Sequence, residues 1–391
     1  MLAALAFVLV NLVLYFGGPN EKAKLTLESL GDLNLAKNTG RLASWWIANS
    51  YLSEKTPPDV VLFGSSQLGG LQAADADLLK KPQDYVLDHK SVSLEEELKR
   101  HKLSANCFAI GIVGCMASDQ LMLSKVLLSR QNSPKLLIAT VSPRDFIDGH
   151  LPSITSTEIF KWYSPYVSNA AIADEFLSDP IEKASWLATS GLPLRSIYHN
   201  GQHELETTEP VTDMGAKPHK RLAADPLLTT NNESMVNIRP GQCIVTPNMP
   251  KFFVDNSNDY KKRYSNWHGT MYRQQIACFN KFLASAKARG IHVLVVGMPL
   301  DSSNASLLPE AFWSDYRNQI QTACSGNGAT FLELSHDNEF GRGDFVDGVH
   351  LSARGGSKIA RRMSNTIAST PGLVTAFRTH SGSQIADATT H

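Results

Sequence analysis

The chain has 391 residues, 42% of them hydrophobic and 19% charged, which is enough to build a sizeable core and excludes both an intrinsically disordered and a multispanning membrane protein. Its 37 Lys and Arg residues balance 37 Asp and Glu residues. A net charge of zero provides no basic footprint, so we expect no nucleic-acid partner.

The N-terminus differs in character from the rest of the chain. The run LAALAFVLVNLVLYF is apolar except for Asn11 and ends at Gly17-Gly18-Pro19. It is short for a full membrane span but suits a signal-anchor or a signal peptide, and a buried first helix is the alternative. No small-x-small cleavage site follows, which favours an uncleaved anchor over residues 1–18. This predicts a single-pass membrane protein with an extracytoplasmic domain, periplasmic or at the cell surface, or a secreted one if the segment is cleaved.

After a lead-in segment over residues 19–57, apolar runs alternate with amphipathic ones. Helices that alternate with strands indicate a mainly parallel sheet covered on both faces, so we expect a three-layer α/β/α fold. The segment Ser93-Leu-Glu-Glu96 resembles a capping box that opens a helix. The predicted strands are residues 59–63, 106–110, 135–141, 291–296 and 329–334, and the predicted helices are 93–101, 118–130, 270–289, 309–324 and a last one after His350.

Residues 148–269 interrupt this alternation and are rich in proline and aromatic residues. A loop of this length in a compact domain is usually functional or a subdomain, and we expect an insertion that roofs the carboxyl edge of the sheet. Its aromatic residues over 252–267 are interpreted as subdomain core rather than a sugar-binding platform, and Lys261-Lys262-Arg263 as a solvated face. The polar tail over residues 371–391 is expected to be disordered.

No motif predicts a metal or an organic cofactor. The five cysteines are scattered and form no C-x-x-C pair, so they neither suggest a zinc site nor settle the redox compartment. His199 and His203 have the spacing of two ligands on a helix, but Asn200-Gly201 between them favours a turn.

Two polar motifs follow apolar segments at opposite ends of the chain. The first strand ends in Gly-Ser-Ser-Gln, which places Ser66 at the carboxyl edge of the sheet, where open α/β sheets carry their sites. Asp347 and His350 lie three residues apart before the last helix. A serine becomes a nucleophile when a base takes its proton and a carboxylate orients that base. We therefore expect Ser66 as nucleophile, His350 as general base and Asp347 as orienting carboxylate, the alternative being turn residues and a helix cap.

These motifs carry a resemblance to the SGNH/GDSL hydrolase superfamily. Gly64-Ser65-Ser66-Gln67-Leu68 is similar to its first block, with Ser65 where Asp is usual, and Asp347-Gly-Val-His350 to its Asp-x-x-His block. The G-x-S-x-G elbow of α/β-hydrolases is not met. The resemblance covers residues 58–146 and 270–368. It implies a five-stranded SGNH-type catalytic domain over residues 58–147 and 270–370, which excludes the insertion.

Two further segments resemble the blocks that supply the oxyanion hole. Ala109-Ile-Gly-Ile-Val-Gly114 is similar to the second block, which implies that Gly114 donates its backbone N–H to the oxyanion. Ser142-Pro-Arg-Asp-Phe146 stands where the family has Gly-x-Asn-Asp, with Arg144 in the place of the Asn donor. The resemblance therefore implies an oxyanion hole of Ser66, Gly114 and Arg144, while Arg144 has two other interpretations, a site for an anionic substrate group or an ion pair with Asp145.

A Gly-Ser-Ser first block behind a membrane anchor resembles the DltD-like and AlgX/AlgJ-like subgroup of this superfamily. The resemblance implies acyl transfer, acetyl in first place, to a cell-envelope or exported polysaccharide, or ester hydrolysis on it, through an acyl-serine. It also implies a membrane-bound O-acyltransferase partner and a carbohydrate polymer as substrate. The alternatives are a plain extracytoplasmic carbohydrate or lipid esterase, and a non-catalytic polysaccharide-binding or scaffold protein of an acyltransferase complex.

Overall fold

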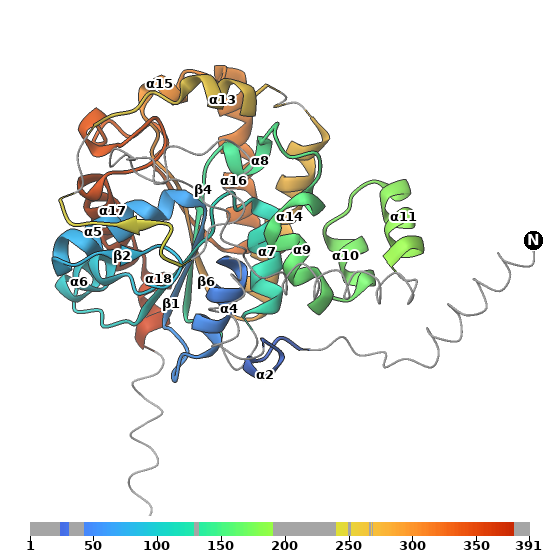
Figure 1. The fold of residues 1–391 in the computed structure, drawn as a ribbon, viewed down its shortest axis with the longest axis horizontal. Coiled ribbons are helices and arrows are strands. Elements are labelled where there is room, and N and C mark those ends of the chain that lie inside the picture. Colours follow the sequence, from blue (N-terminus) through green and yellow to red (C-terminus); the bar gives the residue numbers. More distant parts are fainter. Residues whose placement is uncertain are drawn as a thin grey trace, which may run out of the picture.

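The computed structural model describes residues 24–30, 43–128, 133–190, 240–248, 252–265, 267 and 269–378. At its centre lies a five-stranded, all-parallel sheet with the strand order β3-β1-β4-β6-β7 (Figure 1). The expected α/β fold with a parallel five-stranded sheet between helices is confirmed. The strands are β1 (Val60–Gly64), β3 (Cys107–Gly111), β4 (Leu136–Val141), β6 (His292–Gly297) and β7 (Thr330–Glu333).

The strand sequences are apolar on both faces because both faces are covered. Every residue of β1, β3 and β4 is buried. Along β1 the side chains alternate: Val61 and Phe63 pack into one apolar cluster, whereas Val60 and Leu62 pack into another on the opposite face. The sheet therefore separates two cores.

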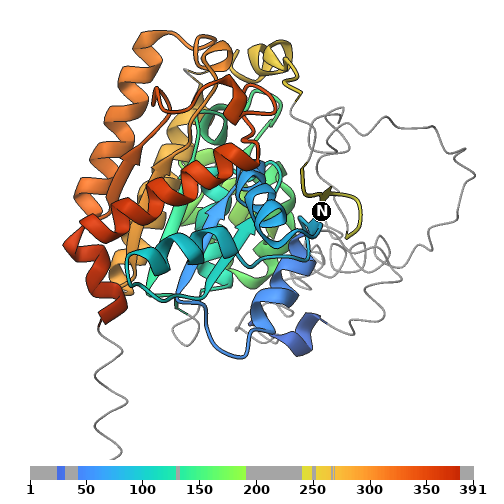
Figure 2. The same ribbon diagram turned by 90° about the vertical axis from the view of Figure 1, so that its left-hand side faces the viewer.

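Two layers of helices cover the sheet, as Figures 1 and 2 show. The helices α5, α6, α17 and α18 cover one face, and α4, α7, α14 and α16 pack on the other. Their bounds are Ala43–Leu52 for α4, Gly69–Leu79 for α5, Val92–Arg100 for α6, Ala117–Val126 for α7, Thr270–Ala288 for α14, Glu310–Asn327 for α16, Ala353–Ser369 for α17 and Pro371–Arg378 for α18.

The remaining elements of the described residues include a second, two-stranded antiparallel sheet formed by β2 and β5. They are α2 (Leu27–Leu30), η1 (Ser66–Leu68), β2 (Gln83–Asp84), α8 (Arg144–Ile147), η2 (Ile154–Ser156), α9 (Glu158–Tyr163), η3 (Ser164–Tyr166), α10 (Asn169–Glu175), α11 (Pro180–Ser190), β5 (Ile244–Val245), α13 (Ser257–Arg263), α15 (Ser302–Ala305) and η5 (Arg342–Asp344).

Residues 154–177 of the insertion extend a helical layer and do not roof the sheet edge, so that expectation is wrong for this part. Phe160, Tyr163 and Phe176 are buried in the same apolar cluster as α7 and α14. The Tyr163 hydroxyl donates to the Ser44 carbonyl at 2.9 Å, which joins α9 to the lead-in helix α4. A later part, residues 252–264, does lie at the carboxyl edge, because the Val254 N–H donates to the Val346 carbonyl at 2.8 Å.

Two further boundaries differ from the sequence prediction. Residues 371–378 form α18, whose Leu373 and Ala376 are buried, so the disordered tail cannot begin at residue 371. Helix α6 begins one residue before Ser93, because the Ser93 N–H donates to Asp75 Oδ1 at 2.6 Å and Ser91 is the N-cap instead. The predicted anchor over residues 1–18 and the end of the tail lie outside the described residues. Within the described part of the chain, no helix has both the length and the apolar character needed to cross a bilayer.

Candidate active site

The nucleophile candidate lies in a tight turn at the carboxyl end of β1. Strand β1 ends at Gly64, and Ser66 opens the short helix η1 that leads into α5. A side chain at Gly64 would overlap Thr140 Oγ1 of the neighbouring strand β4, so this turn requires glycine. Ser66 is 9% exposed, so most of its surface is covered by neighbouring residues.

Close packing of α5 on α17 brings together two segments that lie far apart in the sequence. A Cβ on Gly356 of α17 would overlap the Gly70 carbonyl of α5, and a Cβ on Gly70 would lie 2.6 Å from Leu351 Cβ. The two helices thus touch through backbone. Ser66 lies just before α5, and His350 lies just before α17. The crossing of these two helices therefore carries both residues to the same point.

Ser66, His350 and Asp347 form a hydrogen-bonded chain. Ser66 Oγ lies 2.8 Å from His350 Nε2, and His350 Nδ1 lies 2.7 Å from Asp347 Oδ2. The other carboxylate oxygen of Asp347 accepts the backbone N–H groups of Val349 and His350, both at 2.7 Å. Asp347 is 1% and His350 6% exposed, so packing and hydrogen bonds fix both. The structure brings together the three residues that the sequence proposed, across 284 positions.

Gly114 lies in the loop that follows β3. Its φ is +82°, in the left-handed region that favours glycine. The loop runs beside the nucleophile turn, because the Ile112 N–H donates to the Gly64 carbonyl at 3.1 Å. Helix α7 then starts at Ala117, and Asp119 Oδ2 accepts the Met116 N–H at 2.9 Å to cap it.

The Arg144 guanidinium lies over this loop. A Cβ on Gly114 would be 3.4 Å from Arg144 Nη2, and Nη1 donates to the Cys115 carbonyl at 3.3 Å. The proposed pairing with Asp145 exists at 3.6 Å, and a closer pair, 2.8 Å, joins Nη2 to Asp148 Oδ2. Burial lowers the pKa of Arg144, but the two carboxylates outweigh it and the pKa is raised, so the guanidinium stays charged.

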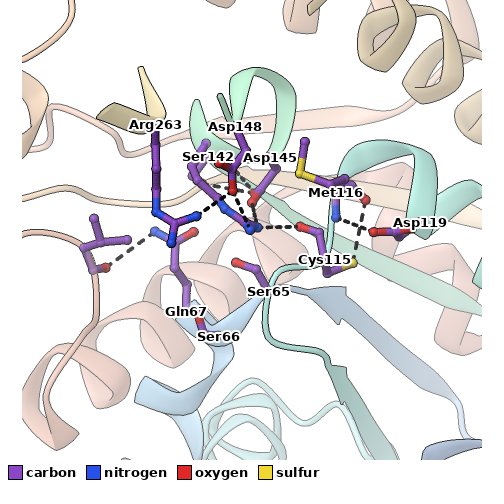
Figure 3. Close-up of polar contacts among 12 residues, drawn as sticks. Ser65, Ser66, Gln67, Cys115, Met116, Asp119, Ser142, Asp145, Asp148 and Arg263 are labelled. Atoms are coloured by element: carbon purple, nitrogen blue, oxygen red, sulfur yellow. Dashed lines mark hydrogen bonds and ion pairs between the residues drawn. The ribbon is translucent and has the colours of Figure 1, made fainter. Parts of the chain in front are cut away.

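Arg263 is a residue of this site that the sequence did not reveal. It belongs to α13 in the insertion, is 8% exposed, and donates to Asp148 Oδ2 at 2.7 Å (Figure 3). The interpretation of Lys261-Lys262-Arg263 as a solvated face is therefore wrong for Arg263. Burial raises the pKa of Asp148, but the charges of Arg144 and Arg263 outweigh it, and the pKa is lowered. Arg144 and Asp148 are four residues apart, which is the spacing of an ion pair on one helical turn. This spacing is the feature of the local sequence that indicates their pairing.

The segment of residues 252–264, called the strap below, also holds the loop that carries Asp347 and His350. The Val254 N–H donates to Val346, and Asn256 Oδ1 accepts the Gly348 N–H at 3.2 Å. From the other side the Asp301 N–H donates to the Gly348 carbonyl at 3.1 Å. The strap thus contacts the loop that carries Asp347 and His350. Through Arg263 it also contacts Asp148, the ion-pair partner of Arg144.

The described residues contain no group of His, Cys, Asp and Glu placed to hold a metal ion. His199 and His203 lie outside the described residues. All five cysteines are described and buried, and no disulfide joins any two of them. Burial raises the pKa of the Cys115 thiol, which keeps this neighbour of the site protonated and a poor competitor to Ser66 as a nucleophile.

No protein-family model matches the sequence, and no curated protein is similar enough to it to indicate a relative.

Proposed function

We propose that this protein is an SGNH-type enzyme that transfers an acyl group to, or hydrolyses an ester on, a cell-envelope or exported polysaccharide. The observation that carries the proposal is the chain from Ser66 Oγ through His350 to Asp347, with links of 2.8 and 2.7 Å. With Nδ1 donating to Asp347, the neutral ring presents a bare Nε2 to the serine hydroxyl, which is the tautomer that a general base requires.

The reaction follows from these contacts. Ser66 Oγ attacks the ester carbonyl carbon while His350 Nε2 takes the hydroxyl proton, and the carbonyl electron pair moves to the oxygen. The intermediate collapses, and the leaving alkoxide takes the proton from His350, which leaves an acyl-Ser66. A carbohydrate hydroxyl or water then gives its proton to His350, attacks the acyl carbon and releases Ser66 with its proton restored.

An oxyanion forms on the carbonyl oxygen in both steps. We assign its stabilisation to the backbone N–H groups of Ser66 and Gly114 and to the Arg144 guanidinium. Arginine carries five N–H bonds. In the described structure the contacts with Asp148 at 2.8 Å and with the Cys115 carbonyl at 3.3 Å engage two of them, and Asp145 at 3.6 Å is an ion pair. We assign the oxyanion to the remaining N–H bonds.

The polymer substrate and the membrane partner follow from the resemblance and stay part of the proposal. An anchor over residues 1–18 would hold the site outside the cytoplasm. There a membrane-bound O-acyltransferase would supply the acyl group, and no metal or organic cofactor is needed for the steps above.

The test is an acetyl-ester assay with and without a polysaccharide acceptor, combined with mass spectrometry of the trapped acyl-enzyme. Ser66→Ala should abolish turnover and acylation. Ser124→Ala is the matched control, since Ser124 is also buried but its hydroxyl donates to the Leu121 carbonyl in α7. Acceptor-dependent product supports the transferase, turnover without acceptor dependence indicates a plain esterase, and glycan binding without acylation indicates a non-catalytic scaffold.

A further inference from the structure

One carboxylate in the site is shared by two arginines. Asp148 Oδ2 lies 2.8 Å from Arg144 Nη2 and 2.7 Å from Arg263 Nη1, and the Asp148 side chain is 1% exposed. Its other oxygen accepts the His150 N–H at 3.0 Å. Figure 3 shows the Arg263 side chain joining Asp148, with its guanidinium beside the Gln67 side chain. Arg144 is the member of the pair that lies next to Gly114, where a Cβ would be 3.4 Å from Arg144 Nη2.

The charges of this cluster balance only when Arg263 is included. Arg144 faces two buried carboxylates, Asp145 and Asp148, so these three groups together are net negative when ionised. With the positive charge of Arg263 included, the net charge of the four groups is zero. Its outer partner Asp259 has a side chain that is 43% exposed, so solvent screens that carboxylate, whereas the inner groups are screened much less.

We propose that Arg263 is a positioning residue for the reaction at Ser66: it holds and neutralises Asp148, so that Arg144 keeps its positive charge for the oxyanion. The proposal rests on the proposed function. Without Arg263, Asp148 would bind Arg144 alone, and a net-negative cluster would oppose the negative charge that forms on the carbonyl oxygen. Because a neutral ester carries no such charge before the attack, the effect falls on the transition state and not on substrate binding.

By this proposal the strap positions residues on both sides of the site. The strap carries Arg263 and also binds the loop of Asp347 and His350 through Val254 and Asn256. A segment inserted between the third and fourth strands of the sheet thus completes both the acid–base side and the oxyanion side of the site.

The experiment compares Arg263→Met with Arg263→Lys, and uses Asp259→Asn as the matched control because it removes only the exposed partner. Two readouts are measured, the kcat and KM for p-nitrophenyl acetate and the affinity for a boronic acid. The boronic acid becomes a tetrahedral anion when it bonds to a serine oxygen. We expect Arg263→Met to lower kcat and boronate affinity together by about 10-fold with KM within about 2-fold, since a single charge in a partly buried site acts at this scale. Arg263→Lys should stay within about 3-fold of the wild type, and Asp259→Asn within about 2-fold.

A double variant separates charge from folding. Arg263→Met combined with Asp148→Asn removes one cation and one anion, and the asparagine oxygen can still accept from Arg144. We expect it to recover most of the lost boronate affinity, whereas a merely structural role predicts a further loss. In an Arg144→Met background, Arg263→Met should have no additional effect.

Three results would overturn the proposal: Arg263→Lys no better than Arg263→Met, no recovery in the double variant, or an unchanged effect without Arg144. Failure of the proposed function looks different, because the wild-type Ser66 would then accept neither an acyl group nor the boronate.

Discussion

The crossing of α5 and α17 predicts that a single methyl group added to Gly356 of α17 disables the site. In Gly356→Ala the new Cβ would overlap the carbonyl oxygen of Gly70 and would also lie 3.1 Å from the Leu71 nitrogen. These are backbone atoms that cannot rotate away, so α17 as a whole must shift, on the order of 1 Å. The shift separates His350 from Ser66, whose contact is 2.8 Å.

Two terms set the expected loss of stability. Overpacking in a dense interior costs about 1–3 kcal/mol, and replacing glycine by alanine within a helix returns about 0.5–1 kcal/mol. The free energy of unfolding should therefore fall by no more than about 2.5 kcal/mol, which is less than the roughly 5–15 kcal/mol of a typical folded protein. Misplacing reacting groups by about 1 Å costs on the order of 100-fold in rate. Activity should fall much further than stability.

The assay is the rate at which an organophosphorus fluoride labels Ser66, measured beside urea unfolding. Gly326→Ala is the matched control, because Gly326 lies within α16 and a Cβ there meets nothing within 4 Å. The free energy of unfolding of Gly326→Ala should rise by up to about 1 kcal/mol. Its Ser66 should be labelled at the wild-type rate. If Gly356→Ala labels as fast as Gly326→Ala, the α5–α17 crossing does not position the site and the reasoning is wrong.

Three further predictions concern other parts of the site. Asp347→Asn should slow Ser66 labelling by about 10⁴-fold with little change in unfolding, because the imidazole loses the partner that sets its tautomer; a loss below tenfold would contradict the orienting role. Gly114→Ala should lower the free energy of unfolding by about 1–2 kcal/mol because of its φ of +82°, and it should slow the labelling of Ser66. Its control is Gly290→Ala, which has a φ of +73° and nothing within 4 Å of the added Cβ. This control should show the loss of stability without the slower labelling. Burial raises the pKa of Asp119 from 3.8 to about 7, so the folded chain holds this proton more tightly than the unfolded chain between pH 4 and 7, and the carboxyl makes the free energy of unfolding fall as the pH rises through that window. Asp119→Asn should remove this slope, up to about 1.4 kcal/mol per pH unit, and parallel urea-unfolding profiles of variant and wild type would refute it.

The strands could be predicted almost to the residue, because short β-branched runs bounded by glycine, serine and proline have few other interpretations. Helix starts were less certain. The motif Ser93-Leu-Glu-Glu96 fits a capping box, but Asp75 of α5 binds the Ser93 N–H and the helix starts at Val92. A hydrogen-bond acceptor that belongs to another helix, as Asp75 does, cannot be predicted from the local sequence around Ser93.

The same distinction applies within the site. Asp347 and His350 are three residues apart, so their pairing is local and their spacing indicates it. Their approach to Ser66 depends on Gly70 and Gly356, whose role appears only once two helices are seen to touch.

Arg263 marks the limit of this kind of inference. Its neighbours Lys261 and Lys262 are exposed, as a basic run in a polar segment predicts. Arg263 is buried because Asp148, 115 residues earlier, provides a carboxylate for it. Burying a charge is costly unless a partner compensates for it. The local sequence therefore predicts correctly that Lys261 and Lys262 are exposed, but it predicts the same for Arg263, which is buried. A long insertion next to a predicted catalytic sheet is therefore a reason to look for charged side chains that return to the site, even where their local sequence indicates a solvated face.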